Sequence, residues 1–103
     1  MLKNINESKL QSKILKDLRS YKQLICFKIK QSSINGVPDI FATSLITGPF
    51  LIEIKKPGEK PNKLQMAIIE KLNKCGIRAL WTDNWPHWVA IKKILNLSHD
   101  TLA

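Results

Sequence analysis

The chain has 103 residues, of which 44% are hydrophobic and 24% are charged. This composition is typical of one globular domain, and it excludes a multidomain protein and a disordered chain. Seventeen Lys and Arg against eight Asp and Glu give a net charge of +9, which suits a polyanionic partner such as nucleic acid. A solvated basic surface is the alternative explanation.

No apolar run reaches the roughly 20 residues that cross a bilayer, and the first residues hold no apolar signal core. Cys26 and Cys75 lie far apart in the sequence and match no metal-binding or redox spacing. We therefore expect a reduced, intracellular and cytoplasmic protein with no membrane partner and no small-molecule cofactor.

Hydrophobic periodicity predicts an α/β domain with the order α-β-β-β-α-β-α. The predicted elements are a helix over 7–21, strands over 24–30, 39–43 and 50–55, a helix over 62–75, a strand over 78–82 and a helix that ends near residue 97. A capping box of Asn4 and Glu7 would start the first helix, and Gly76 is placed to end the second. Residues 1–97 are expected to form a single domain, followed by a frayed tail over 98–103.

Each predicted helix carries an apolar stripe that is expected to face the core. The stripes consist of Leu10, Ile14 and Leu18 in the first helix, Leu64, Ile68, Ile69 and Leu72 in the second, and Trp88, Ile91 and Leu95 in the third. Trp81, on the last strand, is expected in the core together with Trp88. Stacking on unpaired bases is the alternative role for these two and for Trp85.

Three polar residues interrupt the hydrophobic pattern of the middle strands. Glu53 and Lys55 lie two apart and so share one face of their strand, while Asp39 opens the preceding strand. If the turn between these strands centres near residue 46 or 47, an antiparallel hairpin places Asp39 opposite Glu53 or Lys55, at about 5 Å. Paired carboxylates suit Mg²⁺, and such an ion beside a lysine supports phosphate chemistry. A polar strand face is the alternative, but Pro38-Asp39 at this upstream distance favours a site.

Two further polar residues lie on the predicted helices. Helical spacing puts Glu7 in line with the apolar stripe of the first helix, so its carboxylate needs a partner such as a metal or a metal-bound water. The capping box explains Glu7 equally well. Gln65 lies on the inward side of the second helix, where it can bond Lys55 or a bound phosphate, and an ordinary boundary glutamine is the alternative.

Lysines gather near the same part of the chain. Phosphate contacts are expected from Lys28, Lys30, Lys56, Lys60 and Lys63. A lysine-rich loop is also a common solvated surface, so this signal alone does not establish nucleic-acid binding.

The motifs together resemble a known family. Pro38-Asp39 followed by Glu53-Ile54-Lys55 is similar to the signature of the PD-(D/E)XK nucleases. GVPDI (36–40), LIEIKKPG (51–58), Glu7 and Gln65 resemble the VRR-NUC branch, the virus-type replication-repair nucleases. The similarity covers Glu7 to roughly Thr82, and the region that follows matches nothing we can assign.

The resemblance implies a restriction-endonuclease-like core, in which helices flank a central mixed sheet, and metal-dependent hydrolysis of phosphodiester bonds. The implied ligands of Mg²⁺ or Mn²⁺ are Asp39, Glu53 and the backbone carbonyl of Ile54. The resemblance also implies that Lys55 positions or activates the attacking water. It implies that Glu7 holds a metal-bound water or a second ion, and that Gln65 supports Lys55 or the phosphate.

Small stand-alone proteins of this branch are similar to homodimeric Holliday junction resolvases, from phage or bacterial genomes. We therefore expect a metal-dependent DNA endonuclease that cuts branched DNA as a homodimer in a bacterial or phage-infected cell. The alternatives are a nuclease of flaps or duplexes, a non-catalytic nucleic-acid-binding module with the same fold, and a basic structural or assembly factor.

Overall fold

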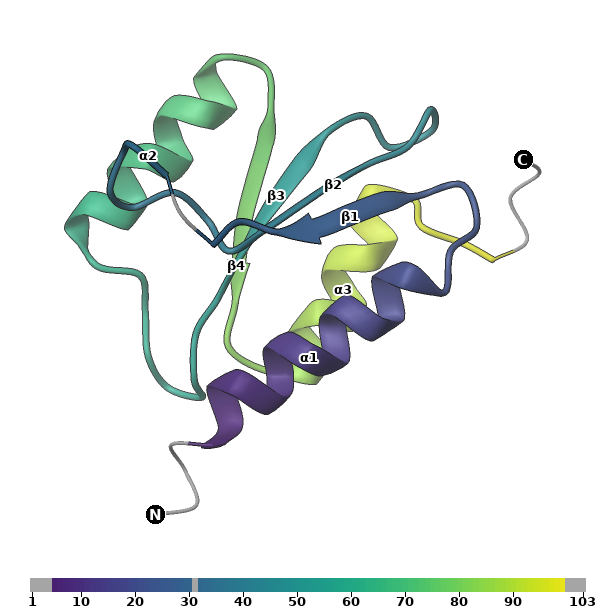
Figure 1. The fold of residues 1–103 in the computed structure, drawn as a ribbon, viewed down its shortest axis with the longest axis horizontal. Helices are drawn as coiled ribbons and strands as arrows, with labels where there is room; N and C mark the ends of the chain where they lie inside the picture. Colours follow the sequence, from purple (N-terminus) through teal and green to yellow (C-terminus); the bar gives the residue numbers. More distant parts are fainter. Residues whose placement is uncertain (1–4, 31, 100–103) are drawn as a thin grey trace.

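The computed structural model describes residues 5–30 and 32–99, apart from the side chains of residues 5 and 6. The predicted order of helices and strands is confirmed (Figure 1). The elements are α1 (Ile5–Arg19), β1 (Ile25–Lys28), β2 (Ile40–Thr43), β3 (Phe50–Ile54), α2 (Lys63–Lys74), β4 (Arg78–Thr82) and α3 (Trp85–Leu95). Among the described helices, none is long and apolar enough to cross a membrane.

The four strands form one mixed sheet in the order β1-β2-β3-β4. Strands β1, β2 and β3 pair antiparallel through short connections, whereas β3 and β4 pair in parallel. A parallel pair needs a long crossover, and α2 supplies it here. This sheet with its flanking helices is the restriction-endonuclease-like arrangement that the resemblance implies.

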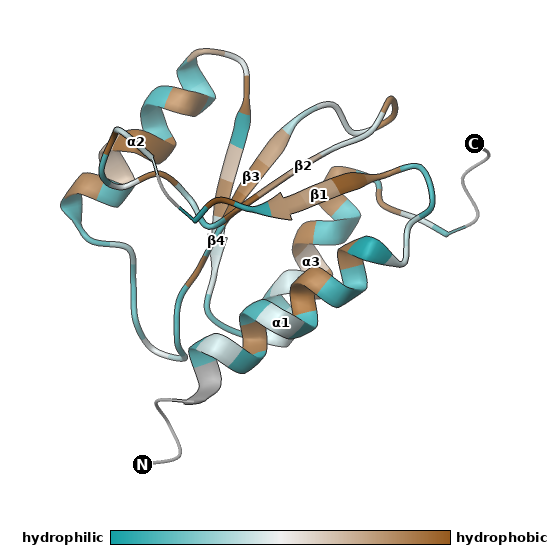
Figure 2. Cartoon of the chain, in the orientation of Figure 1, coloured by the Kyte–Doolittle hydropathy of each residue, from teal (hydrophilic) through white to brown (hydrophobic). Residues whose placement is uncertain are grey.

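The helices cover the two faces of the sheet unequally. On one face α1 and α3 lie side by side, and their buried residues pack in one cluster with Phe50, Ile52 and Ile54 of β3 (Figure 1). Leu51 points to the other face, where it lies near Ile68 and Leu72 of α2. Figure 2 shows the corresponding hydrophobic stretches along the strands and on α1 and α3. Because side chains alternate along β3, this packing leaves Glu53 on the face of α2.

Two of the three predicted helix stripes are confirmed. Ile14, Leu18, Trp88, Ile91 and Leu95 are all buried, and Leu10 packs against them. The prediction for α2 is wrong in part, because Ile69 alone among its residues is buried and the Leu64 side chain is 50% exposed. Leu64 instead lies over the backbone of Gly36, in the loop before β2.

Other predicted details have mixed outcomes. Gly76 follows the C-cap of α2 with a φ of +92°, as expected for a helix-ending glycine. Trp81 is only partly buried and lies outside the core, so that prediction is wrong; its strand position faces the sheet side that α2 covers incompletely. Asn4, and with it the predicted capping box of α1, lies outside the described residues. So do residues 100–103 of the predicted tail, and the domain boundary at residue 97 stays a prediction.

Candidate active site

The register of β2 and β3 brings the two central carboxylates together. Ile40 pairs with Ile52 and Phe41 with Leu51. One position further along this antiparallel ladder, Asp39 stands opposite Glu53, on the same face of the sheet. The sequence allowed either Glu53 or Lys55 as the partner of Asp39, and the register selects Glu53.

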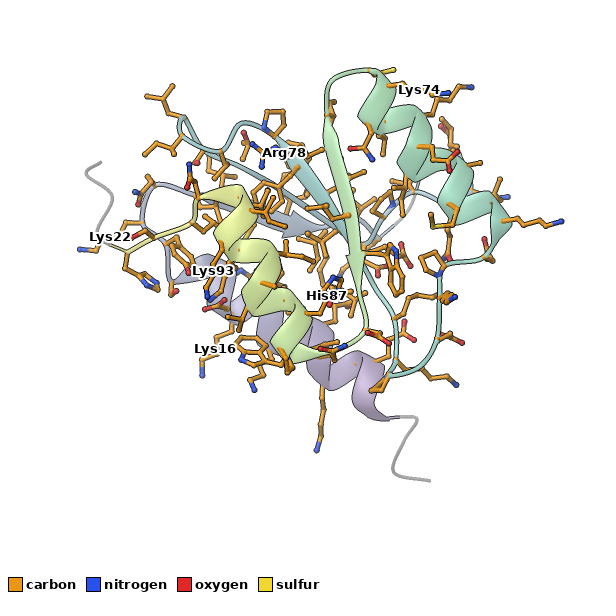
Figure 3. The ribbon with its side chains drawn as sticks, turned by 180° about the vertical axis from the view of Figure 1, so that it is seen from behind. Lys16, Lys22, Lys74, Arg78, His87 and Lys93 are labelled. Carbon is orange, nitrogen blue, oxygen red and sulfur yellow. The ribbon has the colours of Figure 1, made fainter. Side chains whose placement is uncertain are left out.

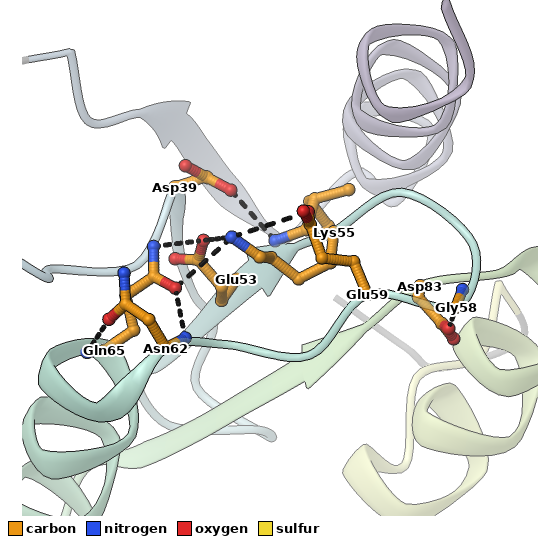
Figure 4. A network of polar contacts seen from close by, with 9 residues as sticks. Asp39, Glu53, Lys55, Gly58, Glu59, Asn62, Gln65 and Asp83 are labelled. Carbon is orange, nitrogen blue, oxygen red and sulfur yellow. Dashed lines mark hydrogen bonds and ion pairs between the residues drawn. The ribbon is translucent and has the colours of Figure 1, made fainter. Parts of the chain in front are cut away.

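Glu53 is a buried carboxylate that is only half satisfied. Its residue is 3% exposed. Its Oε2 accepts a hydrogen bond from the side-chain amide of Gln65 at 3.2 Å and lies 3.8 Å from the Lys55 ammonium (Figure 4). Its Oε1 is buried and has no hydrogen-bond partner among the described residues. Such an oxygen is costly in a folded protein unless a cation or a water occupies the adjoining space.

Lys55 is held in place from three sides. Its Nζ lies 3.8 Å from Glu53 and 3.9 Å from Glu59, and it donates to the side-chain oxygen of Gln65 at 3.3 Å. Its backbone N–H donates to the carbonyl of Thr82 at 2.9 Å, so the end of β3 is fixed on β4. The ammonium therefore stays beside the carboxylates and does not extend into solvent.

Gln65 links the start of α2 to this charged group. Its side-chain oxygen also accepts from the backbone N–H of Asn62 at 2.9 Å, while its own N–H donates to the Asn62 side chain at 2.8 Å. These two bonds form the capping box of α2. One amide thus caps the N-terminus of α2 and contacts both Glu53 and Lys55. Asn62 was missed in the sequence, although an Asn three residues before a Gln is a capping signal.

Asp39 is positioned by the backbone on both sides. Its Oδ2 accepts from the N–H of Ile54 at 2.9 Å, across the hairpin. Pro38 before it is fully buried. Gly36 has a φ of +91°, and a Cβ there would lie 3.1 Å from the Leu64 side chain and 3.2 Å from the Leu64 carbonyl. The motif GVPD therefore needs glycine for its turn and for its close approach to α2.

The electrostatics of the two carboxylates favour a cation. Burial, and next the charge of Asp39, raise the pKa of Glu53 to about 7, with a smaller contribution from Glu7. The pKa of Asp39 is also raised, mainly by burial, although the Ile54 N–H and the charges of Lys55 and Lys28 act against the rise. The positive charge that the protein alone places near the two carboxylates therefore does not offset the cost of ionising them in this buried position.

The first helix contributes from a greater distance. Glu7 is partly buried, and its charge acts on Glu53, but no hydrogen bond or ion pair joins it to another described residue. Gln11, one turn further along α1, lies close enough to Asp39 to act against the rise in its pKa. Gln11 was missed in the sequence, where its spacing of four from Glu7 was the available signal.

The predicted DNA-binding lysines divide into two groups. Lys28 is near enough to act on Asp39, and Lys30 lines a pocket that Asp39 also lines. Lys60 and Lys63 are exposed in and after the loop that leads to α2, and Lys56 directly follows Lys55. Other basic side chains, such as Lys16, Lys74 and Lys93, are spread over α1, α2 and α3 (Figure 3). The positive charge is therefore not confined to the site.

The carboxylates fit a divalent cation on their own chemistry. Within residues 5–30 and 32–99, no three His, Cys, Asp or Glu side chains form a metal-binding group. Mg²⁺ commonly takes one or two carboxylates and completes its shell with waters and substrate phosphate oxygens. Asp39 and Glu53, with the unpartnered Oε1 of Glu53, meet that requirement. The structure does not test the predicted participation of the Ile54 carbonyl.

Comparison with known proteins supports this interpretation through the fold. No family model and no curated protein matches the chain. A solved structure described as a "VRR_NUC domain" matches it with a TM-score of 0.76, over 85% of this chain and 95% of that one, at 16% identity. The chain has the fold of a VRR-NUC domain. The resemblance drawn from the sequence motifs is thereby confirmed at the level of the fold, and the match covers nearly the whole of that domain.

Proposed function

We propose that the protein is a metal-dependent nuclease that hydrolyses phosphodiester bonds in DNA. The observation that carries this proposal is the buried Glu53 carboxylate, which has one unpartnered oxygen, stands opposite Asp39 and lies beside the Lys55 ammonium. A purely structural ion pair would satisfy both oxygens of Glu53. The VRR-NUC fold and the net charge of +9 support the same function.

In this proposal Asp39 and Glu53 hold Mg²⁺ or Mn²⁺, with the Ile54 carbonyl as a further ligand and Glu7 acting through a water. When bound, the ion polarises a phosphoryl oxygen and lowers the pKa of a coordinated water. Lys55 orients the attacking water and stabilises the charge that grows on the phosphate. Gln65 fixes the Lys55 ammonium and Glu53 relative to each other.

The proposed reaction is the hydrolysis of a phosphodiester bond by one water molecule. The oxygen of a water forms a bond to phosphorus, the bond from phosphorus to one sugar oxygen breaks, and a proton passes to that leaving oxygen. The lysines outside the reacting group, Lys28, Lys30, Lys56, Lys60 and Lys63, bind phosphates on either side of the cut.

We further propose branched DNA such as a Holliday junction as the substrate and a homodimer as the active form. Strand β1 is an edge of the sheet, and its Ile25 and Phe27 side chains are 66% and 49% exposed. Exposed apolar edge strands pair readily with another strand, and two copies joined here would supply two sites for paired cuts. Light scattering tests this: the wild type is expected to be dimeric, and Phe27→Lys to lower its dimer fraction. A monomeric wild type would refute the dimer.

Titration of the purified protein with Mn²⁺ tests the site directly. Calorimetry should show binding that Asp39→Asn and Glu53→Gln each abolish, while Glu70→Gln, an exposed carboxylate on α2, leaves it unchanged. Metal binding without cleavage of any DNA would favour the non-catalytic binding module. No binding that depends on Asp39 and Glu53 would refute the proposed metal site.

A further inference from the structure

A pocket adjoins the proposed active site. It is lined by residues 29, 30, 32, 34–37 and 39, and its volume is about 370 Å³. This size lies within the range of pockets that take small organic groups. A Cβ on Gly36 would lie 3.1 Å from the Leu64 side chain and 3.3 Å from the Ile68 side chain, so the loop that carries the pocket lies against α2.

The walls of the pocket suit a nucleobase. Most of its lining is polar, with Ile29 and Ile34 adding apolar surface. Asn35 is exposed and makes no side-chain hydrogen bond to the rest of the described chain, so its amide is available as donor and acceptor. The Ser32 hydroxyl accepts from the Ile34 N–H at 3.1 Å and keeps its own proton to donate. Bases out of a stack are recognised by such edge hydrogen bonds together with contacts to their flat faces.

The position of the pocket relates it to the scissile phosphate. Asp39 belongs both to the pocket wall and to the carboxylate pair. A phosphate at the carboxylate pair therefore places an adjoining nucleotide at the mouth of the pocket. A base inside a duplex is stacked and paired, so its edge is not free to reach Asn35 or Ser32.

We propose that this pocket receives the base of an unpaired nucleotide next to the phosphate that is cut. The inference rests on the proposed nuclease function and adds a reason for substrate choice. Flaps and bulges offer such a nucleotide without the cost of breaking a base pair. In an open four-way junction the base pairs at the branch are stacked on one side only, so they open at a lower cost than pairs inside an intact duplex.

The test uses DNA that carries 2-aminopurine, a fluorescent adenine analogue, at each position around a branch in turn. Binding is measured with Ca²⁺ in place of Mg²⁺, against the same sequence as a fully paired duplex. The emission of the analogue is expected to change at one position only. Asn35→Ala and Ser32→Ala should each weaken binding of the DNA with the unpaired nucleotide by about fivefold to tenfold, as expected for the loss of a hydrogen bond.

Ser33→Ala is the matched control, because Ser33 is exposed in the same loop but does not line the pocket. It should bind as the wild type does. An equal response at every position, or the same affinity and emission in Asn35→Ala as in the wild type, would overturn the inference. If the protein cuts DNA but shows no localised emission change, the pocket fails and the nuclease stands. If the change occurs without cleavage under any divalent metal, the nuclease fails and the pocket stands.

Discussion

The substitution Glu53→Gln should stabilise the metal-free protein at the cost of its activity. Glu53 has a pKa near 7 in the folded chain and an ordinary value of 4.5. At pH values between these two pKa values, the Glu53 carboxyl therefore binds more protons in the folded state than in the unfolded state. The free energy of unfolding of the wild type falls as the pH rises from about 4.5 to 7. The difference corresponds to about 3 kcal/mol, since each tenfold change in proton affinity is worth about 1.4 kcal/mol. Glutamine keeps the shape of the side chain and carries no charge, so it escapes this loss.

Urea unfolding in EDTA at pH 5 and at pH 8 measures the effect. At pH 5 the two proteins should differ little, and at pH 8 Glu53→Gln should be the more stable by up to about 3 kcal/mol. Comparison within each pH removes the contribution of the groups that both proteins share. Glu70→Gln, at an exposed position, is the control and should show no such pH dependence. If wild type and Glu53→Gln differ in free energy of unfolding by the same amount at both pH values, the raised pKa of Glu53 is refuted.

Three other substitutions probe the site and its support. Lys55→Ala should lower the rate of DNA cleavage by about 100-fold or more, while Lys74→Ala, far from the site, leaves the rate unchanged. If Lys55→Ala cleaves DNA at the wild-type rate, the Lys55 ammonium takes no part in the reaction. Gly36→Ala should lose about 1 kcal/mol more unfolding free energy than Gly58→Ala, since both glycines have positive φ but only Gly36 has neighbours within 4 Å; equal losses in urea unfolding would contradict the close contact. Asn62→Ala should cost about 1 kcal/mol of stability and weaken Mn²⁺ binding by about tenfold in calorimetry, and wild-type metal affinity would show that the α2 cap does not position Gln65.

The central carboxylates could be predicted because their spacing depends on local rules. A turn centred at residue 46 fixes the register of β2 and β3, and the period of two along β3 then puts Glu53 beside Asp39 on the face away from Ile52 and Ile54. The apolar stripes of α1 and α3 also followed from a local rule, the periodicity of the helix. Local pattern therefore predicted both the sheet face of the site and most of the core.

What the sequence did not reveal depends on contacts between distant elements. The exposure of Leu64 arises because α2 approaches the loop at Gly36, and a periodic stripe carries no information on which neighbour a helix meets. The approach of Gln11 to Asp39 depends likewise on how α1 crosses the sheet. Gln65 was expected to bond Lys55 or a bound phosphate, but its simultaneous bond to Glu53 and its role in the α2 cap required the fold.

The most direct test of the nuclease is cleavage of labelled four-way junction, flap and linear duplex DNA by the purified protein with Mg²⁺ or Mn²⁺. Asp39→Asn should be assayed beside the wild type, with circular dichroism to show that both are folded. We predict metal-dependent cuts, paired and symmetric on the junction, that the variant does not make. A folded wild type that cuts none of these DNAs with either metal, or an Asp39→Asn variant that cuts as fast as the wild type, would contradict this prediction.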